Sequence, residues 1–149
     1  MNYEVSVDIN AAPDKVWSVL TDVEDWPGWT ESVTRVERLD DGPFAVGSTA
    51  RIKQPRLPAV VWEVTVLEPE RSFSWSNTSA GITTVAGHVV RPNDADGVAF
   101  TNSITQTGPL ASLLGWLTGR MTRRYLQMEA QGLKRRCEAN TQPRDRGTT

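Results

Sequence analysis

The chain has 149 residues, of which 38% are apolar and 23% are charged, and its formal net charge is -2. No apolar run approaches the ~20 residues of a membrane-spanning helix, so we expect no stable membrane insertion. The acidic balance gives no general attraction to phosphate backbones, so we expect no nucleic-acid partner. With Cys137 as the single cysteine, no internal disulfide can form. The first residues lack the basic and apolar segments of an export signal, which favours a cytoplasmic location.

The first predicted elements are a strand and a short helix. Residues 3–10, YEVSVDIN, alternate apolar and polar side chains and predict a strand. Residues 13–22, PDKVWSVLTD, begin with proline and continue with apolar residues at helical spacing, which predicts a short helix. The sequence DWPGW follows at 25–29, and its proline and glycine predict a turn. We expect Trp26 and Trp29 to face inward, either as a hydrophobic plug or as a cap over a cavity.

Short strand-like runs separated by turn signals fill the middle of the chain. Turn signals such as DDGP and NDADG lie between consecutive runs, which predicts an antiparallel meander. The runs are 33–39, 47–54, 60–69, 71–77, 82–90 and 97–107.

The last predicted element is a long amphipathic helix. A helix from 109 to 138 would be about 45 Å long, so we expect a bend or a separate first turn near Gly115 and Gly119. Residues 1–139 are expected to form one domain, and the polar residues 140–149 a flexible tail. The apolar stripe that predicts the helix consists of Leu110, Leu114, Leu117, Met121, Tyr125 and Met128.

The order of strand, short helix, six strands and long helix predicts an α+β fold in which the helix covers one face of the sheet. Four segments carry a family resemblance: VDINAAPDKVWSVLTDVEDWPGW, VVWEVTVLEPERSFSW, the strand around His88, and GPLASLLGWL with LKRRCE. Together they resemble the polyketide cyclase/dehydrase and lipid-transport family of the START-like, helix-grip superfamily. The resemblance covers nearly residues 3 to 139. It implies a strongly curved seven-stranded antiparallel sheet wrapped around the C-terminal helix, with a cavity between them.

Alternation along the strands predicts which side chains face the interior. The predicted inner face is large and apolar except for Asn77, His88 and Asn102, and a buried polar group without a partner costs about 1 to 3 kcal/mol. These three side chains bond to one another, to backbone or to water, or they form the polar end of a ligand pocket. In the run 60–69, Val60, Trp62, Val64 and Val66 are predicted to point inward. The predicted ligand-binding residues are Trp29, Trp62, Trp75, Asn77, His88, Phe100, Asn102, Leu117, Met121 and Tyr125.

Two functions remain open. The sequence contains no GxSxG, GxxxxGK or GxGxxG motif, and one histidine with one cysteine does not suggest a zinc site, so we expect no metal and no cofactor. The first function is binding of a hydrophobic small molecule of lipid, polyketide or isoprenoid type. The alternative is a cofactor-independent polyketide cyclase/dehydratase, for which His88 and Tyr125 are weak catalytic candidates. No inward carboxylate is evident to orient His88.

Basic residues of the C-terminal helix fall mostly outside its apolar stripe and are interpreted as a solvated face. Docking of this face to a membrane or to nucleic acid is the alternative interpretation, and a homodimer stays open. The residues are Arg120, Arg123, Arg124, Lys134, Arg135 and Arg136.

Overall fold

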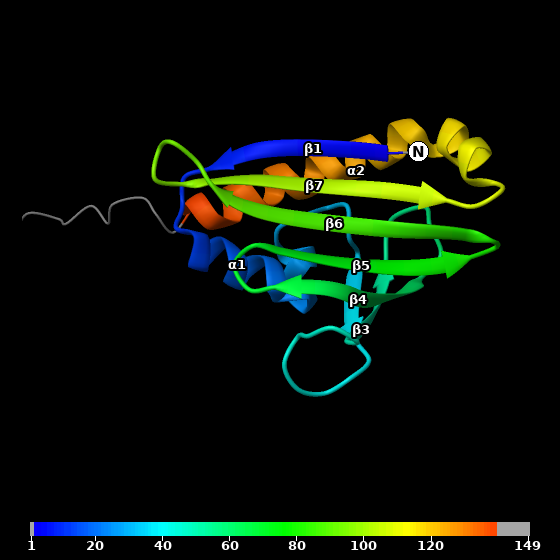
Figure 1. Ribbon diagram of the computed structural model, residues 1–149, viewed down its shortest axis with the longest axis horizontal. Helices are drawn as coiled ribbons and strands as arrows, with labels where there is room; N and C mark the ends of the chain where they lie inside the picture. The colour runs from blue at the N-terminus through cyan, green and yellow to red at the C-terminus, as the bar shows by residue number, and fades with distance from the viewer. Residues whose placement is uncertain (1, 140–149) are drawn as a thin grey trace, which may run out of the picture.

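The computed structural model describes residues 2–139, which form one curved antiparallel sheet with helices on its concave side (Figure 1). The strand order is β1-β7-β6-β5-β4-β3-β2, and neighbouring strands are antiparallel, so the predicted meander and the predicted α+β fold are confirmed. The elements are β1 (Asn2–Ile9), α1 (Pro13–Thr21), the 3-10 helix η1 (Val23–Gly28), β2 (Arg35–Arg38), β3 (Thr49–Lys53), β4 (Val60–Glu68), β5 (Ser72–Ser79), β6 (Ile82–Pro92), β7 (Val98–Thr107) and α2 (Ala111–Ala139). The tail predicted at 140–149 lies outside the described residues.

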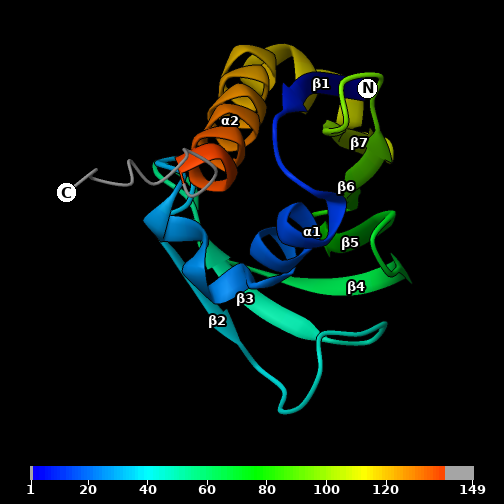
Figure 2. The ribbon, with the colours of Figure 1, turned by 90° about the vertical axis from the view of Figure 1, so that its left-hand side faces the viewer.

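The sheet curves around the two helices α1 and α2. Figure 2 shows α1 inside the concave side and α2 lying across the open side of the curved sheet. The long helix packs on β1 and β7 and also contacts α1. A β-bulge between Val64 and Val66 of β4 shifts the register of that strand. As a result Val66 is 43% exposed, and the expectation that it points inward is wrong.

The long helix has no separate first turn near Gly115 and Gly119, because α2 is continuous from Ala111 to Ala139. Its two early glycines serve a contact with β1 instead. The Tyr3 hydroxyl donates a hydrogen bond to the Gly115 carbonyl (3.0 Å), and a Cβ at Gly119 would lie 2.9 Å from the same hydroxyl. Glycine therefore makes room for the tyrosine without ending the helix.

The buried face of α2 differs from the predicted apolar stripe. Leu117 is exposed, and Leu110, also exposed, lies just before the helix. Small residues allow the helix backbone to come close to its neighbours: a Cβ on Gly132 would lie 2.1 Å from the Trp29 carbonyl oxygen. The buried residues of α2 are Ala111, Gly115, Leu126, Ala130, Gly132, Leu133 and Cys137.

The DWPGW segment forms most of η1 and fills part of the core. Trp26 and Trp29 are both buried, and their ring centroids lie 5.6 Å apart. The Trp26 indole donates a hydrogen bond to the Leu20 carbonyl (2.9 Å), and its ring lies 5.3 Å from that of Trp75. The tryptophans therefore face inward as predicted, and they pack as a hydrophobic plug.

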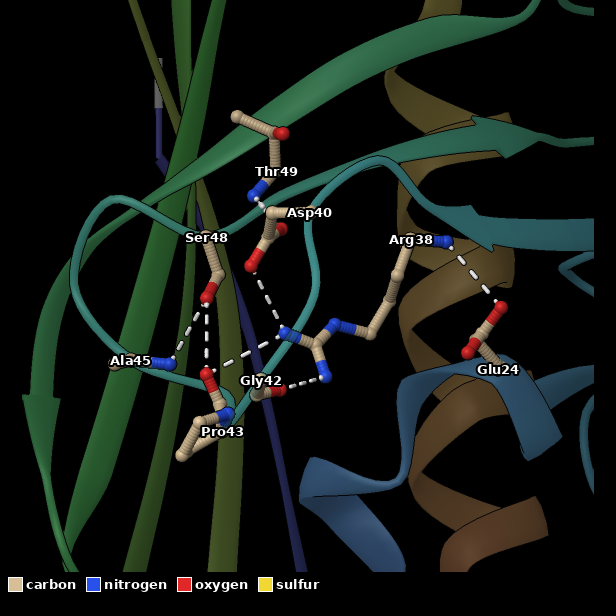
Figure 3. Close-up of polar contacts among 8 residues, drawn as sticks. All are labelled: Glu24, Arg38, Asp40, Gly42, Pro43, Ala45, Ser48 and Thr49. Atoms are coloured by element: carbon tan, nitrogen blue, oxygen red, sulfur yellow. Dashed lines mark hydrogen bonds and ion pairs between the residues drawn. The ribbon is translucent and has the colours of Figure 1, made fainter.

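The loop between β2 and β3 is held by Asp40 (Figure 3). Asp40 accepts hydrogen bonds from the Thr49 amide (2.8 Å) and from the Arg38 guanidinium (3.0 Å). The loop carries Phe44, whose ring lies edge-on to Phe73 at 5.2 Å. The backbone hydrogen bond from Thr49, with smaller contributions from Ser48 and Arg38, lowers the pKa of Asp40 below its usual value of 3.8.

Replacing Asp40 with asparagine is expected to lower the melting temperature slightly at neutral pH. Because the folded-state pKa is lowered, the carboxylate stabilises the fold above pH 3.8, and this contribution is lost as the pH falls through the lowered value. Thermal unfolding followed by circular dichroism should therefore show a difference between wild type and Asp40→Asn that disappears in acid. The adjacent exposed Asp41→Asn is the control, and an equal effect of both variants at neutral pH would contradict the assignment.

The thiol of Cys137 is expected to be unreactive in the folded protein. Its side chain is fully buried, and burial raises its pKa to about 11. Thiolate is the reactive form of cysteine, so both access and ionisation oppose modification at mildly alkaline pH. We expect a thiol reagent such as Ellman's reagent to label Cys137 only after denaturant is added. Rapid labelling of the native protein would contradict the buried position.

Candidate functional site

A cavity of about 410 Å³ lies between the concave face of the sheet and the first half of α2. The sheet contributes apolar side chains such as Ile52, Trp62 and Ile104. Polar side chains enter from β5 and β6, where Asn77 and Thr84 line the wall. The helix closes the cavity with Leu114, Thr118, Met121, Thr122, Tyr125, Leu126 and Glu129.

The cavity is not filled by side chains because α1 and η1 pack against only one half of the concave face of the sheet. The half near α1 and η1 holds a cluster of aromatic rings in which Trp26, Phe73 and Trp75 lie 5.3 to 6.4 Å apart. No residue of α1 or η1 lines the cavity. Side chains of α2 and of the β3–β4 loop cover the other half, and several that face it from α2, such as Thr118 and Thr122, are small. A single helix above a strongly bent sheet therefore leaves a hollow of ligand size.

His88 lies at the boundary between the aromatic cluster and the cavity. Its side chain is 2% exposed, and its ring stacks on Phe73 with centroids 4.2 Å apart. On one side its Nδ1 lies 3.2 Å from the Phe73 carbonyl oxygen, and on the other its Nε2 lies 3.0 Å from Oε1 of Glu129. Glu129 comes from α2 and is itself part of the cavity wall. The expectation that no inward carboxylate orients His88 is therefore wrong.

The tautomer of His88 decides which of its two ring nitrogens donates a hydrogen bond. A carbonyl oxygen can only accept, so a hydrogen bond to Phe73 requires a hydrogen on His88 Nδ1. The second contact joins Nε2 to a carboxyl oxygen, and one proton lies between them. The pair is then either a histidinium with a carboxylate or a neutral histidine with a protonated Glu129. In both forms Glu129 presents a group at the cavity wall that can give up or accept a proton.

Asn102 supports the same region from β7. It lies opposite His88 in the register of β6 and β7 and is fully buried. Its Nδ2 donates a hydrogen bond to the Leu126 carbonyl of α2 (3.0 Å). Its Oδ1 has no hydrogen-bond partner among residues 2–139. Asn102 therefore ties the sheet to the helix one turn before Glu129, in keeping with the structural interpretation of the inner polar groups.

Tyr125 separates the cavity from an outer groove. Its side chain lines both spaces, and its hydroxyl donates a hydrogen bond to the Pro55 carbonyl in the β3–β4 loop (2.6 Å). The same loop contains Arg56, whose φ of 65° is in the left-handed region. Gln54 ties the loop to the chain before β2 by donating to the Ser32 carbonyl (3.2 Å). In this arrangement the tyrosine hydroxyl holds the loop over the cavity and does not point freely at a ligand.

The structure divides the predicted ligand-binding residues into two groups. Trp62, Asn77, Met121 and Tyr125 line the cavity, and their contact with a ligand stays a prediction. The other predicted residues do not line it: Trp29, Trp75, His88, Phe100 and Asn102 are in the packed core, and Leu117 borders the outer groove.

Several cavity residues were not predicted, and Glu129 is the most important of them. It follows Tyr125 by four residues and Met121 by eight, a spacing that places all three on one side of a helix. This spacing was the available signal, but a lone glutamate in a helix is usually solvated. Other polar residues of the cavity wall that were not predicted are Gln54, Thr84, Gln106, Thr118 and Thr122.

The curved sheet and the long closing helix define a helix-grip-like α+β fold. Solved structures share this fold. One is the Zhui aromatase/cyclase from Streptomyces sp. R1128, with 17% identity, a TM-score of 0.76, and coverage of 100% of this chain and 99% of that chain. Another is a START superfamily protein from Mycobacterium smegmatis, with 14% identity, a TM-score of 0.73, and coverage of 93% and 98%. TTHA0849 from Thermus thermophilus has 16% identity, a TM-score of 0.75, and coverage of 95% and 100%.

The chain belongs to the family described as polyketide cyclase / dehydrase and lipid transport, which it matches over residues 1–138. The resemblance noted in the sequence is thereby confirmed. No curated protein matches the chain. At identities of 14 to 17% the solved structures show a shared fold, and function must be argued from the site.

Proposed function

We propose that the protein binds a hydrophobic small molecule of lipid, polyketide or isoprenoid type in the cavity between the sheet and α2. The observation that carries this proposal is the cavity itself, whose volume of about 410 Å³ lies within the range of about 300 to 1,000 Å³ for small-molecule sites. Its walls combine apolar side chains such as Trp62 and Ile104 with a few polar groups, including Asn77 and Glu129. Apolar walls supply the affinity by burial, and the polar groups orient the ligand.

Filling the cavity is expected to weaken binding without unfolding the protein. Thr84 of β6 faces the cavity, whereas Thr83 faces the outer side of the sheet. Native mass spectrometry of the purified protein, together with titration of the neutral fluorescent probe N-phenyl-1-naphthylamine, gives the measurement. We expect wild type and Thr83→Trp to bind the probe, and Thr84→Trp to lose at least about tenfold in affinity, equal to about 1.4 kcal/mol.

Two outcomes of this comparison would contradict the proposal. One is failure of the wild-type protein to bind any member of a broad lipid and polyketide panel. The other is equal loss in Thr83→Trp and Thr84→Trp, because binding would then not depend on the cavity. Circular dichroism of both variants checks that each is folded.

A second candidate function is that of a polyketide cyclase/dehydratase, and the His88–Glu129 pair favours it. Cyclisation by aldol chemistry begins with removal of a proton from the carbon beside a carbonyl, and dehydration ends with protonation of a leaving hydroxyl. Glu129 at the cavity wall, paired to His88 at 3.0 Å, can perform either transfer on a bound chain. The cavity would contribute by holding the chain in a folded conformation.

The test of this second function is exchange of carbon-bound hydrogen in a model ketone. We expect wild-type protein in D₂O to accelerate exchange at the carbon between the ring and the carbonyl of 2-tetralone, followed by proton NMR. Glu129→Gln keeps the size of the side chain but cannot accept the proton, so it should lose at least about 100-fold of the acceleration. Binding of 2-tetralone by wild type without any accelerated exchange would contradict the enzyme function and leave the binding function intact.

A further inference from the structure

The N-terminal part of α2 carries an exposed apolar surface that no part of the described chain covers. We call Leu110, Leu113, Trp116 and Leu117 the apolar tip. Their exposed fractions are 51%, 57%, 79% and 65%. Four neighbouring large apolar side chains at such exposure are unusual on a protein surface and mark an interaction site. Figure 1 shows this end of α2, in yellow, projecting beside the end of the sheet.

Arginines follow the apolar tip along the helix. Arg120, Arg123 and Arg124 are exposed, and residues 111–128 contain no aspartate or glutamate. A groove of about 510 Å³ lies beside them and is lined by Arg56, Arg120 and Arg124 against a single acid, Glu31. Within residues 2–139, none of these three groove arginines forms an ion pair. The groove therefore carries a net positive charge next to an apolar surface.

The combination of apolar tip and arginines fits the surface of an anionic lipid bilayer better than it fits a protein. Leucines reach the acyl chains, tryptophan favours the headgroup level, and arginines bind lipid phosphates. A second copy of the chain docked on the same surface would bring the two arginine clusters together, which like charge opposes. An acidic protein would match the arginines and leave the exposed Trp116 and Leu117 unexplained.

We propose that this surface docks the protein peripherally on a bilayer that contains anionic lipid, with a headgroup phosphate in the groove formed by Arg56, Arg120 and Arg124. Among residues 2–139, no helix is long and apolar enough to cross a membrane. The same turns of α2 line the cavity on their inner side with Leu114, Thr118 and Met121. Docking therefore brings the cavity against the lipid surface, but it does not depend on what the cavity holds.

The test is co-sedimentation with sucrose-loaded vesicles of phosphatidylcholine alone or mixed with phosphatidylglycerol. We expect the wild-type protein to bind the mixed vesicles at least about tenfold more strongly than the neutral ones, and to release them as salt is raised. Arg120→Glu with Arg124→Glu should remove the preference for anionic vesicles. Trp116→Ser with Leu117→Ser should weaken binding by a similar factor. All four side chains are exposed, so we expect these variants to remain folded.

Matched controls come from elsewhere on the surface. Leu39→Ser removes an exposed leucine that directly follows β2, and Arg71→Glu reverses an exposed charge in the turn between β4 and β5. Neither should change vesicle binding. Equal binding to both kinds of vesicle, or no binding at all, would overturn the proposal. A wild-type dimer in light scattering that Trp116→Ser with Leu117→Ser converts to monomer, without vesicle binding, would overturn it in favour of self-association.

Discussion

Replacing Gly132 by valine is expected to destabilise the fold by at least about 3 kcal/mol and to lower the melting temperature by about 10 °C. A Cβ at this position would lie 2.1 Å from the Trp29 carbonyl oxygen and 3.1 Å from its carbon. These are backbone atoms, so no rotation of a side chain can relieve the clash. The whole of α2 must move away from the backbone at Trp29, which directly follows η1, and this opens the contact that holds the helix against the tryptophan plug.

Gly119→Ala is the matched control on the same helix. Its new Cβ would meet the Tyr3 hydroxyl at 2.9 Å, but this is the far end of a side chain and can move. Alanine also gains about 1 kcal/mol of helix propensity over glycine, so the net change should be small. Urea unfolding followed by circular dichroism gives both values. A Gly132→Val protein as stable as wild type would show that α2 does not lie in close contact with the backbone at Trp29.

The second large effect is expected at the His88–Glu129 pair. His88→Phe should cost about 2 to 3 kcal/mol, because it leaves the Glu129 carboxyl with only the cavity to hydrate it. Glu129→Leu should cost a comparable amount, since it leaves Nε2 of a buried histidine without a partner. The double variant should lose less than the sum of the two, by at least about 1 kcal/mol, because neither orphaned group remains.

The control for this cycle combines Glu129→Leu with Thr83→Val, which changes a side chain on the outer face of the sheet. These two substitutions should add, because the residues share no partner. Urea unfolding of all the single and double variants supplies the energies. Strict additivity between His88→Phe and Glu129→Leu would mean that the two side chains do not interact in solution. It would contradict the hydrogen bond between His88 and Glu129.

Much of the fold could be predicted from the sequence because local patterns and tertiary structure agree. The strands alternate cleanly, and turn residues such as those of NDADG separate them, so each run corresponds to one observed strand. Pro13 opens α1 as predicted. The inward tryptophans of DWPGW follow from the cost of leaving such large apolar rings in water. The inner positions of His88 and Asn102 follow from strand alternation alone.

The errors concern close approaches that hydrophobic spacing does not reveal. Helix α2 buries glycine and alanine where backbones nearly touch, and some of its large apolar side chains, including Trp116 and Leu117, are exposed. A bulge in β4 turns Val66 outward, and no glycine or other turn residue in the sequence of this strand indicates the bulge. Glu129 was missed because its partner His88 is 41 residues away in sequence, and only the packing of helix on sheet brings them together.

The two edge strands of the sheet are β2 and β1, and both are poor templates for the addition of a further strand. On one margin, β2 has only four residues, with an Arg35–Glu37 ion pair (3.2 Å) on its exposed side. On the other, β1 exposes the charges of Glu4 and Asp8, and the Lys134 ammonium donates to the Asp8 carbonyl (2.7 Å). Short length and charge at sheet margins discourage neighbouring molecules from joining their strands. The fold can thus combine a hollow interior with sheet edges that discourage the addition of a further strand.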